Sequence, residues 1–200
     1  QQKQRGARTS LWRLLLMGSE GVGKTSMHSV IFANYPAKDT SRIGYTTDRS
    51  EQKFKFMGNL TLNLWDCGGQ KNFMRQYFTT YKETIFKNVE VLIYAFDVDN
   101  DAKMADHLSD FQEALQNLRT YSPTASVFVL VHKMDKIKES EKAARYNNKK
   151  EIIGQKANER DVTVRQFFGT SIWDETLYQA WSQIVQLLIP NMGFIKQTLK

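Results

Sequence analysis

Apolar residues recur along this chain with two different spacings, and these spacings predict its strands and helices. Short runs that are continuously apolar, or that alternate with polar residues, predict strands at 11–17, 52–57, 60–66, 89–96, 126–131 and 164–170. Apolar residues three or four positions apart, or a charged stretch that suits an exposed helix, predict helices within 25–34, 104–121, 136–160 and 177–188. Because 36–49 loses periodicity and a break follows Asp66, we expect loops over 36–49 and 67–80.

Strands that alternate with helices predict an α/β fold with three layers. The expected sheet is six-stranded and mainly parallel, with one antiparallel edge strand from a hairpin at 52–66, and helices cover both faces. A length of 200 residues, a hydrophobic content of 41% and only three prolines suit one compact domain. We therefore expect this domain over 11–190, after a basic flexible tail at 1–10.

The net charge of +7 invites a nucleic-acid or membrane interpretation. Five of the 28 lysines and arginines lie in the expected tails, and the remaining 23 exceed the 21 acidic residues by only two. The five are Lys3, Arg5, Arg8, Lys196 and Lys200. No apolar run reaches the ~18 residues of a membrane span, and the C-terminus carries no cysteine for prenylation. We expect no nucleic-acid partner and no direct membrane anchor.

The first predicted strand runs into the pattern G-x-x-x-x-G-K-T, from Gly18 to Thr25. A strand, a glycine turn and a helix N-terminus in this order direct successive backbone N–H groups at an anionic phosphate. Gly21 and Gly23 allow close backbone approach. Lys24 reaches the β- and γ-phosphates, and the Thr25 hydroxyl meets Mg²⁺. The pattern predicts the phosphate-binding loop of a P-loop NTPase.

Two further breaks follow later strands, Asp-Cys-Gly-Gly-Gln at 66–70 and His-Lys-Met-Asp at 132–135. Open α/β sheets bind ligands outside the carboxyl ends of their strands, so these breaks are expected to converge with the P-loop. Together with Thr-Ser-Ile at 170–172 they resemble the small GTPases of the Ras superfamily. Their wording is most similar to that of Rag GTPases of the A/B type, over about residues 12–190. His-Lys-Met-Asp and the stretch Thr-Ser-Ile-Trp-Asp-Glu-Thr separate this type from other branches.

The resemblance implies recognition of guanine at the second half of the site. Asp135 would accept hydrogen bonds from the guanine N1–H and N2 amine, which adenine cannot supply. Lys133 would lie along the base, and a backbone N–H near Ile172 would meet the guanine carbonyl oxygen. His132 replaces the asparagine of most GTPases with a ring that also has one donor and one acceptor when neutral.

The resemblance also implies GTP hydrolysis with Mg²⁺. The metal would be held by Thr25, by Asp66 through water, and by Thr46 from the long loop, with Thr47 as the alternative to Thr46. Gln70 would orient the attacking water, Lys24 would share the catalytic role, and Gly69 would donate its N–H to the γ-phosphate through glycine's backbone freedom. The expected nucleotide-binding set is Glu20, Gly21, Val22, Gly23, Lys24, Thr25, Ser26, Thr40, Thr46, Gly69, His132, Lys133, Asp135, Ser171 and Ile172.

Glu20 departs from the family pattern, because Ras-type proteins have glycine and Rag A types a small residue at this place beside the γ-phosphate. A carboxylate pointing inward would repel phosphate, so we expect it to face solvent or Lys71. As a hypothesis, Glu20 obstructs an arginine finger or the attacking water and makes hydrolysis slow. One alternative function is therefore a GTP/GDP-binding scaffold with negligible hydrolysis. Another is a P-loop ATP kinase, although no arginine-rich lid is evident.

The resemblance implies partners as well. A C/D-type Rag subunit would pair through a C-terminal domain absent from this chain, with 191–200 as the start of the linker, so we expect a monomeric fragment. GTPase activators, exchange factors and TOR complex 1 components would act on the switch in amino acid signalling. The protein would be cytoplasmic, as its single cysteine also indicates, and partners would recruit it to a lysosomal or vacuolar membrane.

Other patterns have simpler explanations. The spacing Asp97-x-Asp99-x-Asp101 resembles the opening of a calcium loop, but Ala102 and Leu108 replace its glycine and glutamate, so we expect helix capping. Cys67 is expected to be a small buried filler. The three histidines lack metal-ligand spacing.

Overall fold

The computed structural model describes residues 10–43, 50–56 and 60–188. Its strands form one sheet in the order β2-β3-β1-β4-β5-β6. Their bounds are β1 Ser10–Gly18, β2 Ser50–Phe56, β3 Leu60–Asp66, β4 Val91–Asp97, β5 Ser126–His132 and β6 Gln166–Thr170. β2 pairs antiparallel with β3, and the other neighbours pair in parallel. The predicted α/β class is confirmed.

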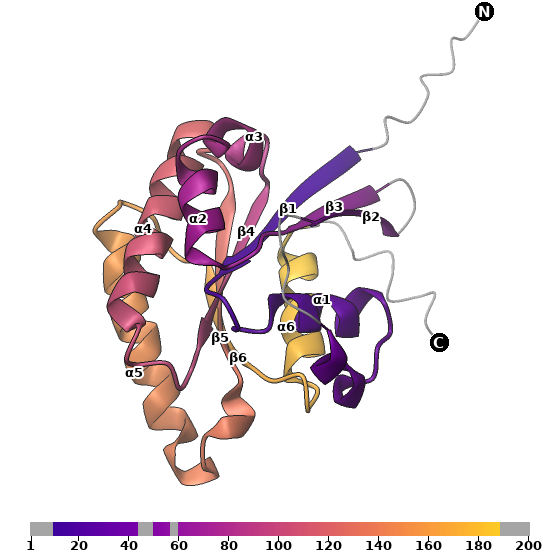
Figure 1. The fold of residues 1–200 in the computed structure, drawn as a ribbon, viewed down its shortest axis with the longest axis vertical. Helices are drawn as coiled ribbons and strands as arrows, with labels where there is room; N and C mark the ends of the chain where they lie inside the picture. The colour runs from indigo at the N-terminus through magenta and orange to yellow at the C-terminus, as the bar shows by residue number, and fades with distance from the viewer. Residues whose placement is uncertain (1–9, 44–49, 57–59, 189–200) are drawn as a thin grey trace, which may run out of the picture.

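Helices lie on both faces of this sheet. The α-helices are α1 Lys24–Phe32, α2 Lys71–Phe78, α3 Lys82–Phe86, α4 Met104–Tyr121, α5 Glu139–Asn158 and α6 Thr176–Leu188. Two short 3₁₀ helices are η1 Ala37–Arg42 and η2 Met134–Lys136. Figure 1 shows α1 and α6 together on one face and α2 to α5 on the other.

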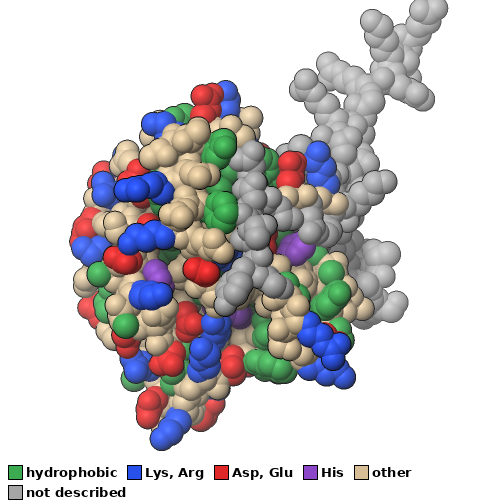
Figure 2. Space-filling model, in the orientation of Figure 1, with side chains coloured by type: hydrophobic (Ala, Val, Ile, Leu, Met, Phe, Trp, Pro, Cys, Tyr) green, Lys and Arg blue, Asp and Glu red, His purple; other side chains and the backbone are tan. Residues whose placement is uncertain are grey.

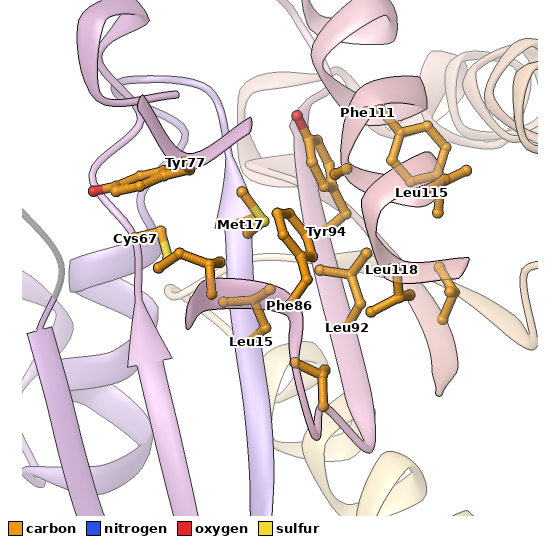
Figure 3. Packing of buried hydrophobic residues seen from close by; sticks show 14 of the residues in the cluster. Leu15, Met17, Cys67, Tyr77, Phe86, Leu92, Tyr94, Phe111, Leu115 and Leu118 are labelled. Carbon is orange, nitrogen blue, oxygen red and sulfur yellow. The ribbon is translucent and has the colours of Figure 1, made fainter. Parts of the chain in front are cut away.

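Alternation along the strands divides the core into two clusters. Leu15 and Met17 of β1 pack with β4 and with helices α2 to α4, and Figure 3 shows this packing around Tyr94. Leu14 and Leu16 belong to the other cluster, with α1 and α6. Both faces of the central strands are therefore buried, which explains their continuous apolar runs. Cys67 is fully buried in the first cluster, as expected of a small filler.

The prediction of a loop over 67–80 is wrong for most of its length. Residues 71–78 form α2, and α3 follows closely. The helix forms because Met74, Tyr77 and Phe78 recur at helical spacing and are buried against the sheet. Six of the other loop's fourteen residues, 37–42, form η1, whereas 44–49 lie outside the described residues.

Charge is mixed on the face shown in Figure 2, where basic and acidic side chains lie among one another. None of the helices in the described ranges combines the length and apolarity needed to cross a bilayer.

Candidate functional site

The predicted motifs meet at the carboxyl edge of the sheet. Leu16 of β1 pairs with Asp66, the last residue of β3, and Gly18 pairs with Ala95. On the other side, Asp97 at the end of β4 pairs with His132, which in turn pairs with Thr170 at the end of β6. The predicted convergence of the strand ends is therefore confirmed.

Lys24 lies inside the P-loop at the N-terminus of α1. Its Nζ donates hydrogen bonds to the carbonyl oxygens of Gly18, at 2.8 Å, and Ser19, at 2.9 Å. The side chain is buried, and this burial lowers the pKa of Lys24 to about 8 despite the opposing charge of Asp66. Gly23 enters the helix with φ +101°, a conformation that favours glycine. The loop thus presents a buried cation and a helix N-terminus together, which suits an anion.

Thr25 and Asp66, two of the expected metal ligands, are in contact. The Thr25 hydroxyl donates to Asp66 Oδ2 at 2.9 Å. Burial raises the pKa of Asp66, and the nearby Lys24 partly opposes this. Within the described ranges, the buried Oδ1 of Asp66 has no hydrogen-bond partner. An unpaired carboxylate oxygen beside a hydroxyl is a donor set that fits Mg²⁺.

No group of three or more His, Cys, Asp or Glu residues that could hold a metal occurs in the described part of the chain. This agrees with the way Mg²⁺ is usually held, by one or two protein ligands with substrate phosphates and water.

Gly69 packs directly on the P-loop. A Cβ atom built on Gly69 would lie 2.4 Å from the backbone N of Glu20 and 2.4 Å from the carbonyl carbon of Ser19. Glycine is therefore needed here because a side chain would collide with the P-loop backbone. The expected reason was backbone freedom, but the φ angle of Gly69 is not positive. Gln70 follows at the N-cap of α2 and is half-buried.

Glu20 is exposed, in agreement with one of its two expected orientations. It lines a cleft of about 400 Å³ between the P-loop, the start of α2 and α4. Lys71 lines the same cleft, and its ammonium lies 3.5 Å from Asp106. The cleft is therefore charged and opens beside Gly69.

His132 joins the P-loop to β6. It is almost fully buried, and its Nδ1 lies 2.9 Å from Thr170 Oγ1. Burial lowers the pKa of His132 to about 4, and the charge of Lys133 contributes in the same direction. A Cβ atom on Gly23 would lie 3.4 Å from the ring Nε2, so the imidazole sits against the P-loop backbone. The ring is neutral near pH 7 and fills a structural position between the two halves of the site.

Lys133 adopts a left-handed conformation, with φ 64°, directly after β5. Its Nζ donates to the carbonyl oxygen of Gly21 at 2.6 Å and to Asp97 Oδ2 at 2.8 Å. Asp97 was not among the predicted site residues, although its place at the end of β4 was a signal.

The predicted capping of the following helix by the Asp97–Asp101 stretch is wrong. The N-cap of α4 is Lys103, without a side-chain hydrogen bond, and the carboxylate of Asp101 pairs with Lys149 and Arg145 instead.

Asp135 is exposed in η2, and its orientation is set by Ser171. The Ser171 hydroxyl donates to Asp135 Oδ1 at 2.6 Å and accepts a hydrogen bond from the Trp173 N–H at 3.0 Å. Ser171 is itself fully buried. An exposed carboxylate held in place by a buried hydroxyl is suited to recognise a ligand with paired N–H donors.

A comparison with protein families matches this chain to the Gtr1/RagA G protein conserved region over residues 13–200. The chain belongs to the Gtr1/RagA family. The resemblance to Rag GTPases of the A/B type is thereby confirmed.

Individual relatives agree. "GTP-binding protein GTR1" of Saccharomyces cerevisiae is 48% identical over 188 residues, which are 94% of this chain and 60% of that protein. "Ras-related GTP-binding protein A" of Dictyostelium discoideum is 46% identical, over 94% of this chain and 61% of that protein. "Ras-related GTP-binding protein B" of Rattus norvegicus is 40% identical, over 94% and 57%. The chain thus spans about 60% of the length of these relatives.

Some of the remaining predicted site residues of this Gtr1/RagA domain are described by the structure, and others lie outside the described residues. Val22 is a buried residue of the P-loop itself, and Ile172 packs against the cluster that contains α1 and α6. Thr40 is buried in η1, where its hydroxyl donates to the Ala37 carbonyl at 2.7 Å. Its contact with a nucleotide stays a prediction. Thr46, like Thr47, lies outside the described residues.

Proposed function

We propose that this Gtr1/RagA domain binds GTP and GDP with Mg²⁺, hydrolyses GTP slowly, and changes its affinity for other proteins with the nucleotide. The observation that carries this proposal is the position of Lys133. Its ammonium contacts the Gly21 carbonyl of the P-loop, and Asp135 follows it two positions later in the sequence. Phosphate-binding and base-recognising groups are therefore held at one edge of the sheet. The relatives are named GTP-binding proteins, which supports the same ligand.

The phosphate end has the residues for a triphosphate. The buried ammonium of Lys24 and the N–H groups at the start of α1 supply positive potential. Thr25 and Asp66 would hold Mg²⁺, which in GTPases neutralises charge between the β- and γ-phosphates. Gln70 is the candidate to orient the attacking water, since it follows Gly69 at the point where this segment meets the P-loop.

The base end has the residues for guanine. Asp135 can accept two hydrogen bonds in the plane of a base, and Ser171 fixes one of its oxygens. Guanine offers two N–H donors on the matching edge, whereas adenine offers an acceptor at N1 and leaves the carboxylate unpaired. Such a mismatch gives strong discrimination.

Nucleotide preference tests the proposal directly. Protein stripped of nucleotide would be titrated calorimetrically with GDP, GTP, ADP and ATP in the presence of Mg²⁺. We expect the guanosine nucleotides to bind at least roughly a hundredfold more tightly than the adenosine nucleotides. Equal affinities would refute the proposal and favour an ATP-binding enzyme.

A second function, a nucleotide-binding scaffold with negligible hydrolysis, is favoured by Glu20. This carboxylate borders the cleft beside Gly69. Its charge would oppose the approach of an anion there, and its side chain would obstruct an activator's arginine. Single-turnover phosphate release from bound GTP separates the two functions. Equal rates for the wild type and Gln70→Leu favour the scaffold, whereas a slower Gln70→Leu variant supports hydrolysis.

We attribute the proposed slow hydrolysis of GTP to Glu20. We expect Glu20→Gly to raise intrinsic or activator-stimulated turnover by roughly tenfold, and Glu20→Gln, which keeps the size but removes the charge, to show which property matters. Unchanged turnover in both variants contradicts this role for Glu20.

The relatives also support a proposal about protein partners. "GTP-binding protein GTR2" of Saccharomyces cerevisiae and "Ras-related GTP-binding protein C" of Homo sapiens are each 28% identical to this chain. We propose that this protein pairs with such a C/D-type subunit, and that activators, exchange factors and TOR complex 1 components act on the pair at a lysosomal or vacuolar membrane. Light scattering of this chain mixed with a C/D-type G domain tests the pairing region, because a stable heterodimer formed by the G domains alone contradicts pairing through a C-terminal domain.

A further inference from the structure

Asp97 connects the two halves of the site without belonging to either predicted motif. It is the last residue of β4 and lies in register with His132. Its side chain is 10% exposed, and its two oxygens have different partners. Oδ2 accepts the 2.8 Å hydrogen bond from Lys133 and lies 3.8 Å from Lys136 Nζ, whereas Oδ1 accepts from the Asp99 N–H at 3.0 Å.

Contacts other than the one with Lys133 also hold the Asp97 carboxylate in place. Asp97 is held by its own loop through Asp99, and the Val98 N–H donates to the His132 carbonyl at 3.0 Å, which ties the same loop to β5. Burial alone raises the pKa of Asp97, but hydrogen bonds from Lys133 and Asp99 together hold it below its usual value. The group is thus a fixed negative charge near neutral pH.

Lys133 is fixed at both ends of its side chain. The left-handed backbone sets where the stem leaves β5, and the ammonium is clamped between Asp97 and the Gly21 carbonyl. A lysine stem has several rotatable bonds, and holding it in one conformation costs entropy that the ion pair with Asp97 offsets. The aliphatic part of the Lys133 side chain then offers a fixed surface against which a flat base can pack. The ammonium holds the P-loop at Gly21.

We propose that Asp97 is a positioning residue that slows nucleotide release by clamping Lys133 against the P-loop. This inference rests on the proposed function, since it assigns a role at the guanine-nucleotide site. Asp97 acts through Lys133 and not on the γ-phosphate. Its loss is therefore expected to speed the release of GDP and GTP by the same factor.

The chain offers a matched control in the same loop. Asp101 also accepts two charged hydrogen bonds, from Lys149 at 2.6 Å and from Arg145 at 2.7 Å. These partners belong to α5 and not to the P-loop. Asp97→Asn and Asp101→Asn make the same chemical change at nearby positions, so only the variant that acts through Lys133 is expected to alter the site.

The test measures the dissociation rate of fluorescent GDP and of a fluorescent non-hydrolysable GTP analogue during a chase with unlabelled nucleotide. We expect Asp97→Asn to speed both rates by roughly tenfold, the size expected for weakening one charge-assisted hydrogen bond. Asp101→Asn is expected to change them by less than about twofold. A wild-type rate in Asp97→Asn, or equal acceleration in both variants, overturns the inference.

A double-mutant cycle distinguishes positioning from general destabilisation. If Asp97 acts through Lys133, then Asp97→Asn combined with Lys133→Met releases nucleotide no faster than Lys133→Met alone. Additive acceleration overturns the inference, and it does so even if Asp97→Asn lowers the melting temperature. Failure of the proposed function has a different signature, because wild-type protein would then show no preference for guanosine nucleotides.

Discussion

The charged groups at the phosphate end of the site are buried, whereas those at the base end are in contact with solvent. Lys24 and Asp66 are 5% and 3% exposed. Burial lowers the pKa of Lys24 and raises the pKa of Asp66, so in both cases it favours the neutral form. At the base end Asp135 is exposed, and Lys133 keeps 24% of its side chain exposed with a carboxylate partner. Desolvated charges gain most from a charged ligand, whereas solvated and oriented groups discriminate by geometry. The comparison predicts that affinity comes from the phosphate end and specificity from the base end.

Removing the buried cation is expected to have the largest effect. Lys24→Met keeps much of the side chain's volume but removes the ammonium that would face the phosphates. We expect the affinity for GTP and GDP to fall by about a thousandfold, as when one partner of a buried charge pair is truncated. Calorimetric titration checks this.

Lys149 provides the matched control, since it is another buried lysine, 2% exposed, that pairs with Asp101. Lys149→Met is expected to lower the melting temperature and to leave affinity for nucleotide nearly unchanged. Loss of less than tenfold in affinity in Lys24→Met would show that the phosphate end does not dominate binding.

At the base end, Asp135→Asn is expected to change which base is bound. The amide cannot accept both guanine N–H groups, so guanosine affinity is expected to fall by about a hundredfold. Xanthine has a carbonyl where guanine has its N2 amine, and the new amide N–H can donate to it, so preference is expected to move to xanthosine nucleotides. Competition binding with GDP, XDP and ADP measures the change.

Asp174→Asn tests whether any nearby carboxylate has this effect. Asp174 is exposed in the segment between β6 and α6 and accepts a hydrogen bond from the Thr176 N–H. We expect its variant to keep the guanosine preference. If Asp135→Asn also keeps it, then Asp135 does not contact the base.

The strands and the P-loop could be predicted from sequence because their signals are local. The apolar run before Gly18 and the charged or glycine residues after it lie within a dozen positions, and the structure confirms their arrangement. Helix α2 was missed because its apolar face is short, with Met74, Tyr77 and Phe78 in a segment of only eight residues. Its helical state depends on burial against the sheet, which the local sequence does not show.

The contacts that complete the site depend on how distant strands align. Asp97 meets Lys133 because β4 pairs with β5 in a register that puts Asp97 opposite His132. The spacing of residues along the chain does not predict this register. Gly69 was predicted to matter, but the reason, its closeness to the Ser19 and Glu20 backbone, requires coordinates.

The smallest expected effect concerns His132, the buried neutral group at the base end. The folded protein holds the pKa of this imidazole at about 4, whereas an unfolded chain has it near 6.5. Between these values the unfolded state binds a proton that the folded state does not, so the free energy of unfolding falls as pH is lowered. Between pH 7.5 and 5.0 we expect His132 to account for about 2 kcal/mol of this loss.

His132→Asn removes the titrating group while keeping one donor and one acceptor. Urea denaturation of nucleotide-free protein at both pH values measures the free energy of unfolding without a contribution from ligand. We expect the variant to lose about 2 kcal/mol less than the wild type between pH 7.5 and 5.0. If both proteins lose the same amount, His132 does not titrate differently in the folded and unfolded states.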